Sequence, residues 1–218
     1  MELKRVVVTG LGALTPVGNN VAETWENLVN GVSGAGPITH FDASNFKTQF
    51  ACEVKGFKAN EHLDRKEARK MDLYTQYAIV AAKEAIEDSA MDLDKVDKNK
   101  IGVIFGVGIG GLNTLEEELF NYALNKDTMG PKFNPFFIPK MIADIASGHI
   151  SIMYGFHGPN FTTTSACASS SNAIADAFNY IRLGKANVIV AGGAEAAICA
   201  SGVGGFNAMH ALSTRNDD

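Results

Sequence analysis

The sequence predicts an α/β fold in which helices cover both faces of a parallel or mixed sheet. Three short runs rich in β-branched residues each end in glycine, at residues 5–10, 101–106 and 188–192. Apolar runs of this length are typical of strands that are buried on both faces. Helical patterns lie between the runs, and this alternation of strands and helices is the arrangement of a layered α/β protein.

The composition is that of a soluble globular protein. The chain has 218 residues, of which 46% are hydrophobic and 20% are charged, enough to bury a substantial core. The net charge of −5 argues against nucleic acid as the main partner. The N-terminal residues lead directly into an apolar run that is too short for a signal peptide or a membrane span. We therefore expect a cytoplasmic protein that does not enter a membrane.

The first predicted strand, residues 5–10, is followed by a pair of glycines. Gly10 and Gly12 have the spacing that opens a dinucleotide-binding turn, but Thr15 occupies the third glycine position and Pro16 follows it. We do not expect a cofactor at this turn.

The clearest helical pattern covers residues 65–90. Apolar residues recur there at helical spacing, at Met71, Tyr74, Ala78, Ala81, Ala82, Ala85 and Ile86. Asp64 and Glu67 have the spacing of a capping box, in which each side chain accepts a hydrogen bond from a backbone N–H at the helix entrance. The pattern predicts one long helix.

The second predicted strand, residues 101–106, leads into a glycine-rich loop. Residues 106–111 match G-x-G-x-x-G after a strand and before a helix. However, Glu116, Glu117 and Glu118 follow, and carboxylates near a helix N-terminus would repel a pyrophosphate. We interpret the glycines as sites of close backbone packing rather than as a nucleotide site.

A helix is predicted at residues 113–125, followed by a proline-rich segment at 131–139. Three prolines end the helix, and Phe133, Phe136 and Phe137 make the segment unusually apolar for a loop. An apolar loop needs a cover. A partner subunit, a ligand tunnel and the core of the chain itself are equally good interpretations.

The most informative site is the predicted turn between a strand at residues 161–164 and a helix that ends at Gly184. Cys167 lies at this turn, between the small residues Ala166 and Ala168. The amides and the dipole at a helix N-terminus favour the thiolate, and the Cys167 N–H can stabilise an oxyanion when the thiolate attacks a carbonyl. The alternative is a buried cysteine that packs as a small hydrophobic residue.

The other two cysteines and the five histidines give weaker signals. Cys52 and Cys199 lie in apolar segments, and we predict that both are buried in the core. The cysteine spacings match neither a disulfide framework nor a zinc site. No two of the five histidines have the helical spacing of a metal-binding pair. The histidines are His40, His62, His149, His157 and His210. We therefore expect no metal and no cofactor.

Taken together, several segments resemble one family, the condensing enzymes of the thiolase-like fold. The matching segments follow in the family's order over the whole chain, at residues 6–12, 15–19, 65–67, 69–72, 108–112, 135–139, 165–167, 191–195, 202–206 and 211–217. Within the family, the chain resembles most the elongating β-ketoacyl-acyl-carrier-protein synthases of type II. The resemblance implies a layered αβαβα fold and a function in fatty acid biosynthesis.

The resemblance also implies roles for individual residues. Cys167 would accept an acyl group from acyl carrier protein, and a carbanion from malonyl-acyl carrier protein would then attack the thioester. Ile109, Gly202 and Phe206 match positions that line the acyl pocket, and Phe137 matches one that reaches it across a homodimer interface. The positions that dock the carrier protein are matched by Lys66, Arg69, Lys70 and Lys132. His210 replaces a further basic docking residue of the relatives.

The family's chains consist of two similar halves and are about twice as long as this one. The resemblance therefore implies that residues 1–218 form the N-terminal half, which carries the nucleophilic cysteine. The C-terminal half, absent from this chain, would carry two histidines that assist decarboxylation, a lysine and a gating phenylalanine. We expect the 218-residue chain alone to be inactive.

Three rival functions remain open at the level of sequence. One is a polyketide-type condensing enzyme, which would differ in its carrier and product. Another is a non-catalytic partner subunit of a condensing heterodimer, although such subunits typically lack the active cysteine. A nucleotide-binding protein ranks last. The preferred length of the acyl chain cannot be derived from this sequence.

Overall fold

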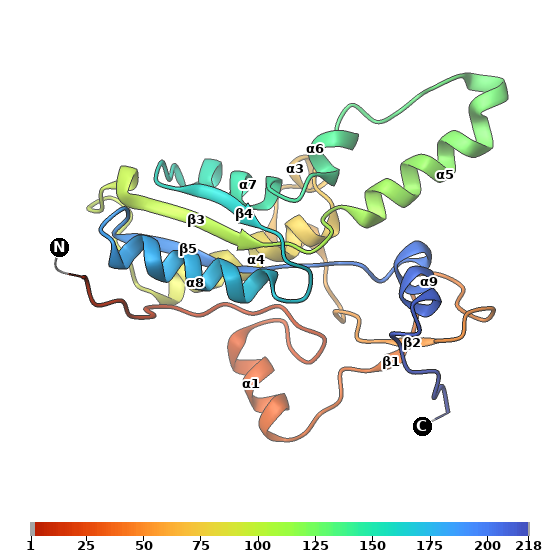
Figure 1. The fold of residues 1–218 in the computed structure, drawn as a ribbon, viewed down its shortest axis with the longest axis horizontal. Helices are drawn as coiled ribbons and strands as arrows, with labels where there is room; N and C mark the ends of the chain where they lie inside the picture. The colour runs from red at the N-terminus through yellow and green to blue at the C-terminus, as the bar shows by residue number, and fades with distance from the viewer. Residues whose placement is uncertain (1–2, 218) are drawn as a thin grey trace.

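The computed structural model describes residues 3–217, so the terminal Asp218 lies outside the described residues. A parallel sheet of three strands lies at its centre, with the order β4-β3-β5. The strands are β3 (Ile101–Gly106), β4 (Asn160–Thr163) and β5 (Val188–Gly193). Helix α8 (Ser169–Arg182) covers one face of the sheet, and α4 (Leu73–Asp88) and α7 (Ile145–Tyr154) cover the other (Figure 1). The predicted α/β layering is confirmed.

The central strand β3 explains how these layers are held together. Successive side chains of a strand point to opposite faces. Ile101, Val103 and Phe105 belong to the core formed with α4 and α7, whereas Ile104 packs against Ala173 and Ala177 of α8. All six residues of β3 are buried. By contrast, β5 lies at the edge of the sheet and is only partly buried, so the predicted burial of this strand on both faces is wrong.

The predicted first strand, residues 5–10, is not a strand in the structure. Val7 and Val8 are 57% and 79% exposed, so the prediction of a buried strand is wrong. The chain instead runs along α4, where Leu11 N donates to Asp88 Oδ2 and Ala13 N donates to Glu84 Oε2, each at 2.8 Å. Side-chain carboxylates of α4 therefore satisfy two backbone groups just after the run and hold this segment along the helix.

The predicted helix at residues 65–90 is interrupted. It forms as α3 (Arg65–Ala68) and α4, which begins at Leu73. Asp64 caps α3 by accepting from Lys66 N and Glu67 N, but Glu67 pairs with Lys70 instead of completing the capping box. The break has a local cause, because the Asp72 side chain accepts a hydrogen bond from Tyr74 N and caps a new helix.

Asp72 also connects α4 to the next helix. Its carboxylate is 2% exposed and accepts hydrogen bonds from Thr114 N at 2.9 Å and from Thr114 Oγ1 at 2.6 Å. Removing a buried acceptor leaves its donors without a partner in the interior. We therefore expect Asp72→Ala to lower the free energy of unfolding by about 2–4 kcal/mol, from the lost cap and the unpaired donors.

Urea denaturation would measure this difference, with Asp97→Ala as the matched control. Asp97 also caps a helical turn, η1 (Lys98–Lys100), but on the surface. We expect the control to cost about 1 kcal/mol or less. Equal losses in the two variants would contradict the role assigned to Asp72.

Helix α5 (Leu112–Met129) extends away from the sheet, and a long segment returns from its end to α6 (Phe137–Met141) (Figure 1). The predicted helix at residues 113–125 is confirmed, and the proline-rich segment is a loop up to Phe136. Phe133 stacks on Tyr122 and on Phe137. Since Phe133 and Phe136 remain 39% and 41% exposed, the loop is not tucked onto the core of this chain.

The remaining elements surround this framework. They are α1 (Val21–Val29), the hairpin β1 (Gly36–Pro37) and β2 (Phe50–Ala51), α2 (Ala59–His62), η1 and α9 (Ala200–Ala208).

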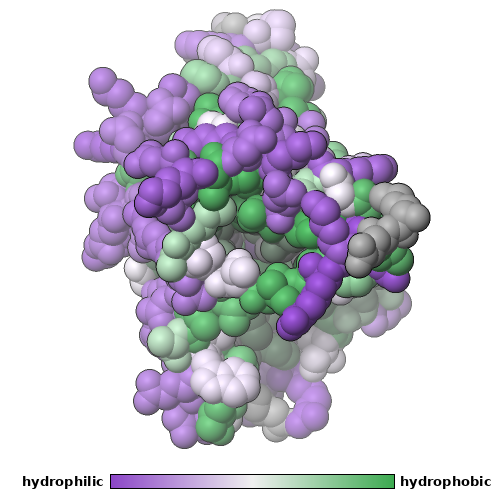
Figure 2. All heavy atoms as spheres, turned by 90° about the vertical axis from the view of Figure 1, so that its left-hand side faces the viewer, coloured by the Kyte–Doolittle hydropathy of each residue, from purple (hydrophilic) through white to green (hydrophobic). Residues whose placement is uncertain are grey.

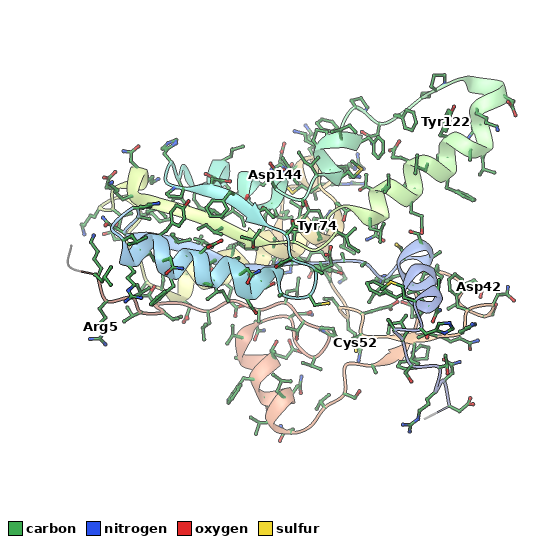
Figure 3. The ribbon with its side chains drawn as sticks, viewed as in Figure 1. Arg5, Asp42, Cys52, Tyr74, Tyr122 and Asp144 are labelled. Carbon is green, nitrogen blue, oxygen red and sulfur yellow. The ribbon has the colours of Figure 1, made fainter. Side chains whose placement is uncertain are left out.

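In the core, the Tyr74 hydroxyl donates to Ile142 O at 2.6 Å, close to Asp144 (Figure 3). Burial raises the pKa of Tyr74 to about 12. None of the helices in residues 3–217 is both long and apolar enough to cross a membrane.

Apolar side chains are also found on the surface of the molecule. Trp25, Leu28 and Val29 of α1 are 68%, 56% and 68% exposed, in addition to Val7 and Val8. Figure 2, which faces the end of the molecule near the N-terminus, shows hydrophobic side chains between the hydrophilic ones. Exposed apolar area on this scale is typical of surfaces that another chain or segment covers.

Candidate active site

The turn between β4 and α8 holds Cys167 in a constrained position. Ala166, the preceding residue, has a φ of 51°, in the left-handed region that a residue with a side chain rarely adopts. Such a conformation costs about 1–3 kcal/mol and is often found at functional sites. The buried Ser169 hydroxyl stabilises it by accepting from Ser165 N at 2.9 Å and donating to Ala166 O at 2.7 Å.

Cys167 itself is exposed, so the alternative of a buried structural cysteine is not supported. The residue precedes the first helical residue of α8 by two positions, and the N-cap residue Ala168 makes no side-chain hydrogen bond to the helix. The positive end of the helix dipole therefore lies next to the thiol, where it favours a negative charge. An exposed sulfur in this setting can attack an electrophile that approaches from solvent.

The other two cysteines differ in their exposure to solvent. Cys199 is 5% exposed and belongs to the core, as predicted. The prediction that Cys52 is buried is wrong, because this residue is exposed. It directly follows the two-residue strand β2 (Figure 3). It lines a cavity of about 380 Å³ with His40 and Tyr77.

The glycine-rich loop that follows β3 binds a carboxylate of the chain itself. Glu195, just after β5, accepts hydrogen bonds from Gly108 N at 3.0 Å, Ile109 N at 2.8 Å and Gly110 N at 3.2 Å. Consecutive backbone N–H groups that point at one anion form a nest. The donors that a bound phosphate would use are thus taken by Glu195, which supports the interpretation that this motif is not a nucleotide site.

The four predicted docking residues lie together. Lys66, Arg69, Lys70 and Lys132 line one surface groove of about 650 Å³, which also contains Phe133 and Phe136. Lys70 pairs with Glu67 at 2.6 Å and lies 5.8 Å from the centre of the Phe136 ring. The groove therefore combines positive charge with exposed aromatic surface. His210 is not among its lining residues.

His149 lies near this groove but adds no charge to it at neutral pH. Burial lowers the pKa of its imidazole, Glu67 raises it and Lys70 lowers it further. Because the overall shift is downward from 6.5, the neutral form dominates at pH 7. The positive charge of the groove thus comes from its lysines and its arginine.

The four predicted acyl-pocket residues are distributed over three elements that meet at the glycine-rich loop. Ile109 lies in this loop and is 47% exposed. Gly202 and Phe206 belong to α9, and a Cβ at Gly202 would lie 3.3 Å from Leu112, three residues after Ile109. Phe137 begins α6, whose last residue, Met141, accepts a hydrogen bond from Gly111 N at 3.0 Å. Contacts at the end of the glycine-rich loop therefore connect these residues.

Two features of the site were missed by the sequence analysis. The strain at Ala166 has no sequence signal, because alanine is not typical of left-handed turns. Glu195 was noted only as part of a family motif, although an acidic residue directly after a strand of a parallel sheet could have been placed near the loop after the neighbouring strand.

Within residues 3–217, no three His, Cys, Asp or Glu side chains are grouped so that they could hold a metal ion.

Comparison with known proteins places this geometry in context. Residues 3–218 match the family model described as Beta-ketoacyl synthase, N-terminal domain. A 3-oxoacyl-acyl-carrier-protein synthase 2 of Synechocystis sp. is 48% identical over 100% of this chain and 52% of its own length. A synthase of the same name from Staphylococcus aureus is 45% identical over 98% of this chain and 51% of its own length. The chain thus spans about half the length of the curated relatives it matches.

Three solved structures also align with this chain over about half of their own lengths. A beta-ketoacyl synthase from Burkholderia phymatum aligns with a TM-score of 0.85 at 29% identity, over 99% of this chain and 52% of its own. The ishigamide ketosynthase/chain length factor aligns with a TM-score of 0.87 at 27% identity, over 97% and 52%. A type II PKS ketosynthase, solved in complex with its acyl-carrier protein and bound to the hexaketide, aligns with a TM-score of 0.80 at 25% identity, over 94% and 55%.

Proposed function

Because the chain belongs to the β-ketoacyl synthase family, as its N-terminal domain, we propose that it provides the acyl-accepting cysteine of a 3-oxoacyl-acyl-carrier-protein synthase of fatty acid biosynthesis. Its fold is that of one half of the thiolase-like ketosynthases, as the sequence predicted. The single observation that supports the proposal most strongly is the exposed Cys167 on a strained turn before α8.

The reaction assigned to Cys167 is an acyl transfer. Its thiolate attacks the thioester carbonyl of an acyl carrier protein, a carbon–sulfur bond forms, and the thiol of the carrier leaves as the oxyanion collapses. The positive end of α8 stabilises both the thiolate and the oxyanion. In the second step, malonyl-acyl carrier protein loses CO₂ and its carbanion attacks the acyl-cysteine. A carbon–carbon bond forms, the carbon–sulfur bond to Cys167 breaks, and the Cys167 thiolate leaves as the 3-oxoacyl-acyl carrier protein is released.

We assign carrier docking to the groove of Lys66, Arg69, Lys70 and Lys132. Complementary charge speeds the encounter of two proteins and orients them. The joint position of these four residues supports the assignment. A related ketosynthase has been solved with its acyl-carrier protein, which supports a partner of this kind.

We assign the acyl chain to the space next to the glycine-rich loop, with Ile109, Gly202 and Phe206 in contact with it. Phe137 is proposed to approach the same site of a second copy in a homodimer. Ile138, next to Phe137 in α6, supports the homodimer because it is 55% exposed in the single chain. We expect the protein to act in the cytoplasm, where a carrier protein would deliver its substrates.

The rival functions are less well supported. The type II PKS ketosynthase and the ishigamide ketosynthase/chain length factor are 25% and 27% identical to this chain, whereas the synthase 2 relatives are 45% and 48% identical. A non-catalytic partner subunit is disfavoured by the presence of Cys167 in an exposed, strained turn.

Acyl transfer can be measured directly. A full-length protein that carries this chain together with a C-terminal half is incubated with a medium-chain acyl-acyl carrier protein, and the intact masses of both proteins are recorded over time. We expect one acyl group per chain to appear on the protein as free carrier protein accumulates. A synthase 2 relative serves as the positive control. If the relative is acylated and the folded full-length protein remains unmodified, the proposed function is wrong.

A further inference from the structure

We propose that Glu195 is a positioning residue for acyl transfer. Its carboxylate fills the nest of residues 108–110 and thereby fixes the glycine-rich loop against the turn that holds Cys167. The inference rests on the proposed function, because it concerns how fast Cys167 is acylated. It differs from that function in assigning a role to an anion that does not touch the reacting atoms.

The contacts of Glu195 are unusual for an exposed side chain. One oxygen, Oε2, accepts from Gly108 N and Ile109 N, and the other, Oε1, accepts from Gly110 N. Hydrogen bonds to an ionised acceptor are about twice as strong as those between neutral groups. Three such bonds connect the end of β5 to the end of β3, so that the loop cannot move independently of the sheet.

The glycines of the loop permit this arrangement. A Cβ at Gly108 would lie 2.8 Å from Glu195 Oε2, so a larger residue would displace the carboxylate. Gly110 has a φ of 93°, which residues with side chains rarely adopt. The backbone of the loop is therefore shaped around the anion, and loss of the anion would leave three N–H groups that no longer share an acceptor.

The loop is also the neighbour of the nucleophile turn. A Cβ at Gly108 would lie 3.6 Å from Ala166 O, on the residue that precedes Cys167. Ile109, which we assign to the acyl chain, donates its N–H to Glu195 at 2.8 Å. The position of Glu195 thus controls both the wall of the proposed acyl site and the residue before the nucleophile.

Replacing Glu195 tests this role. We expect Glu195→Ala to slow acylation of Cys167 about 10- to 100-fold, because small displacements of reacting groups reduce rates by such factors. The carrier concentration at half-maximal rate is expected to stay unchanged, since Glu195 does not line the docking groove. Glu195→Gln keeps one carbonyl oxygen and should be intermediate. The matched control is Glu117→Ala, which removes an exposed carboxylate from α5.

Chemical rescue distinguishes positioning from a general loss of structure. Glu195 is exposed and lines the cavity of about 380 Å³, so a small carboxylate can reach the nest emptied in Glu195→Ala. We expect sodium acetate to restore at least part of the lost rate, whereas acetamide, similar in shape but neutral, should not. Neither compound should accelerate the wild-type protein or Glu117→Ala.

Amide hydrogen exchange gives a readout that does not depend on acylation. Exchange at residues 108–110 is expected to accelerate in Glu195→Ala and to slow again with acetate. Wild-type rates of acylation in Glu195→Ala would overturn the positioning role, as would a slow variant that acetate does not rescue. If the wild-type protein is not acylated while exchange responds as expected, the proposed function fails and the contact between Glu195 and the loop stands.

Discussion

Replacing Cys167 with alanine is expected to abolish acyl transfer from the carrier protein. The sulfur is the atom that would form the thioester, and no neighbouring side chain of the turn can replace it, because Ala166 and Ala168 flank it. We expect the rate to fall about a thousandfold or more, as for other enzymes that lose their nucleophile. Time-resolved intact-mass spectrometry of the protein after mixing with acyl-acyl carrier protein measures this rate.

The matched control is Cys52→Ala. Cys52 is the other exposed cysteine, but it is not followed by a helix N-terminus. We expect this variant to be acylated at the wild-type rate. Both substitutions remove an exposed side chain and should change the free energy of unfolding by about 0.5 kcal/mol or less. Acylation of Cys167→Ala at the wild-type rate would show that the turn is not the site of reaction.

Reversing charge in the docking groove is expected to slow acylation by weakening the encounter with the carrier. Lys66 and Lys132 lie on separate segments, but both line the groove and both are exposed. We expect the double variant Lys66→Glu and Lys132→Glu to lose about 10- to 100-fold in rate at low carrier concentration, since charge steering contributes factors of this size. At saturating carrier the rate should approach that of the wild type.

Lys95→Glu reverses one charge outside the groove, and its matched comparison is the single variant Lys66→Glu, which changes the net charge by the same amount. Lys95 is exposed and does not line the groove. We also expect the wild-type rate to decrease as salt increases, and the double variant to depend less on salt, because ions screen the attraction. Equal losses in Lys95→Glu and Lys66→Glu would mean that the groove has no specific role in docking.

The strands show what sequence patterns can and cannot predict. The apolar run at residues 101–106 became the buried central strand, whereas the similar run at residues 5–10 remained outside the sheet. Just after this run, Leu11 and Ala13 donate to Asp88 and Glu84 of α4, so the segment is held along a helix. These contacts join residues more than 70 positions apart, and periodicity along the chain contains no information about them.

The predictions of the helices were wrong or right for local reasons. The pattern at residues 65–90 correctly marked a buried apolar face but hid the break before Leu73. Asp72 lies within that pattern and is also a good N-cap residue, so its side chain starts a new helix. The helix after Cys167 was predicted well because a small-residue turn and the glycine at position 184 mark its two ends.

The sequence predicted which residues belong to the site better than it predicted how they are arranged in space. The four docking residues come from segments about 60 positions apart, and only the resemblance to a family grouped them before the structure did. The position of Cys167 before a helix was evident from sequence, and its exposure was not. The left-handed Ala166 could not be inferred, because it depends on the folded arrangement. The position of Glu195 after a strand places it near the loop after the neighbouring strand, but only the structure shows that it contacts residues 108–110.

The central claim is that Cys167 is the residue that accepts the acyl group, and peptide mapping of the acylated protein tests it most directly. The chain contains three cysteines, so protease digestion and tandem mass spectrometry can assign the added acyl mass to one of them. We predict that the mass lies on Cys167 alone, in the wild-type protein and in Cys52→Ala. An adduct on Cys52 or Cys199, with Cys167 unmodified, would contradict the account.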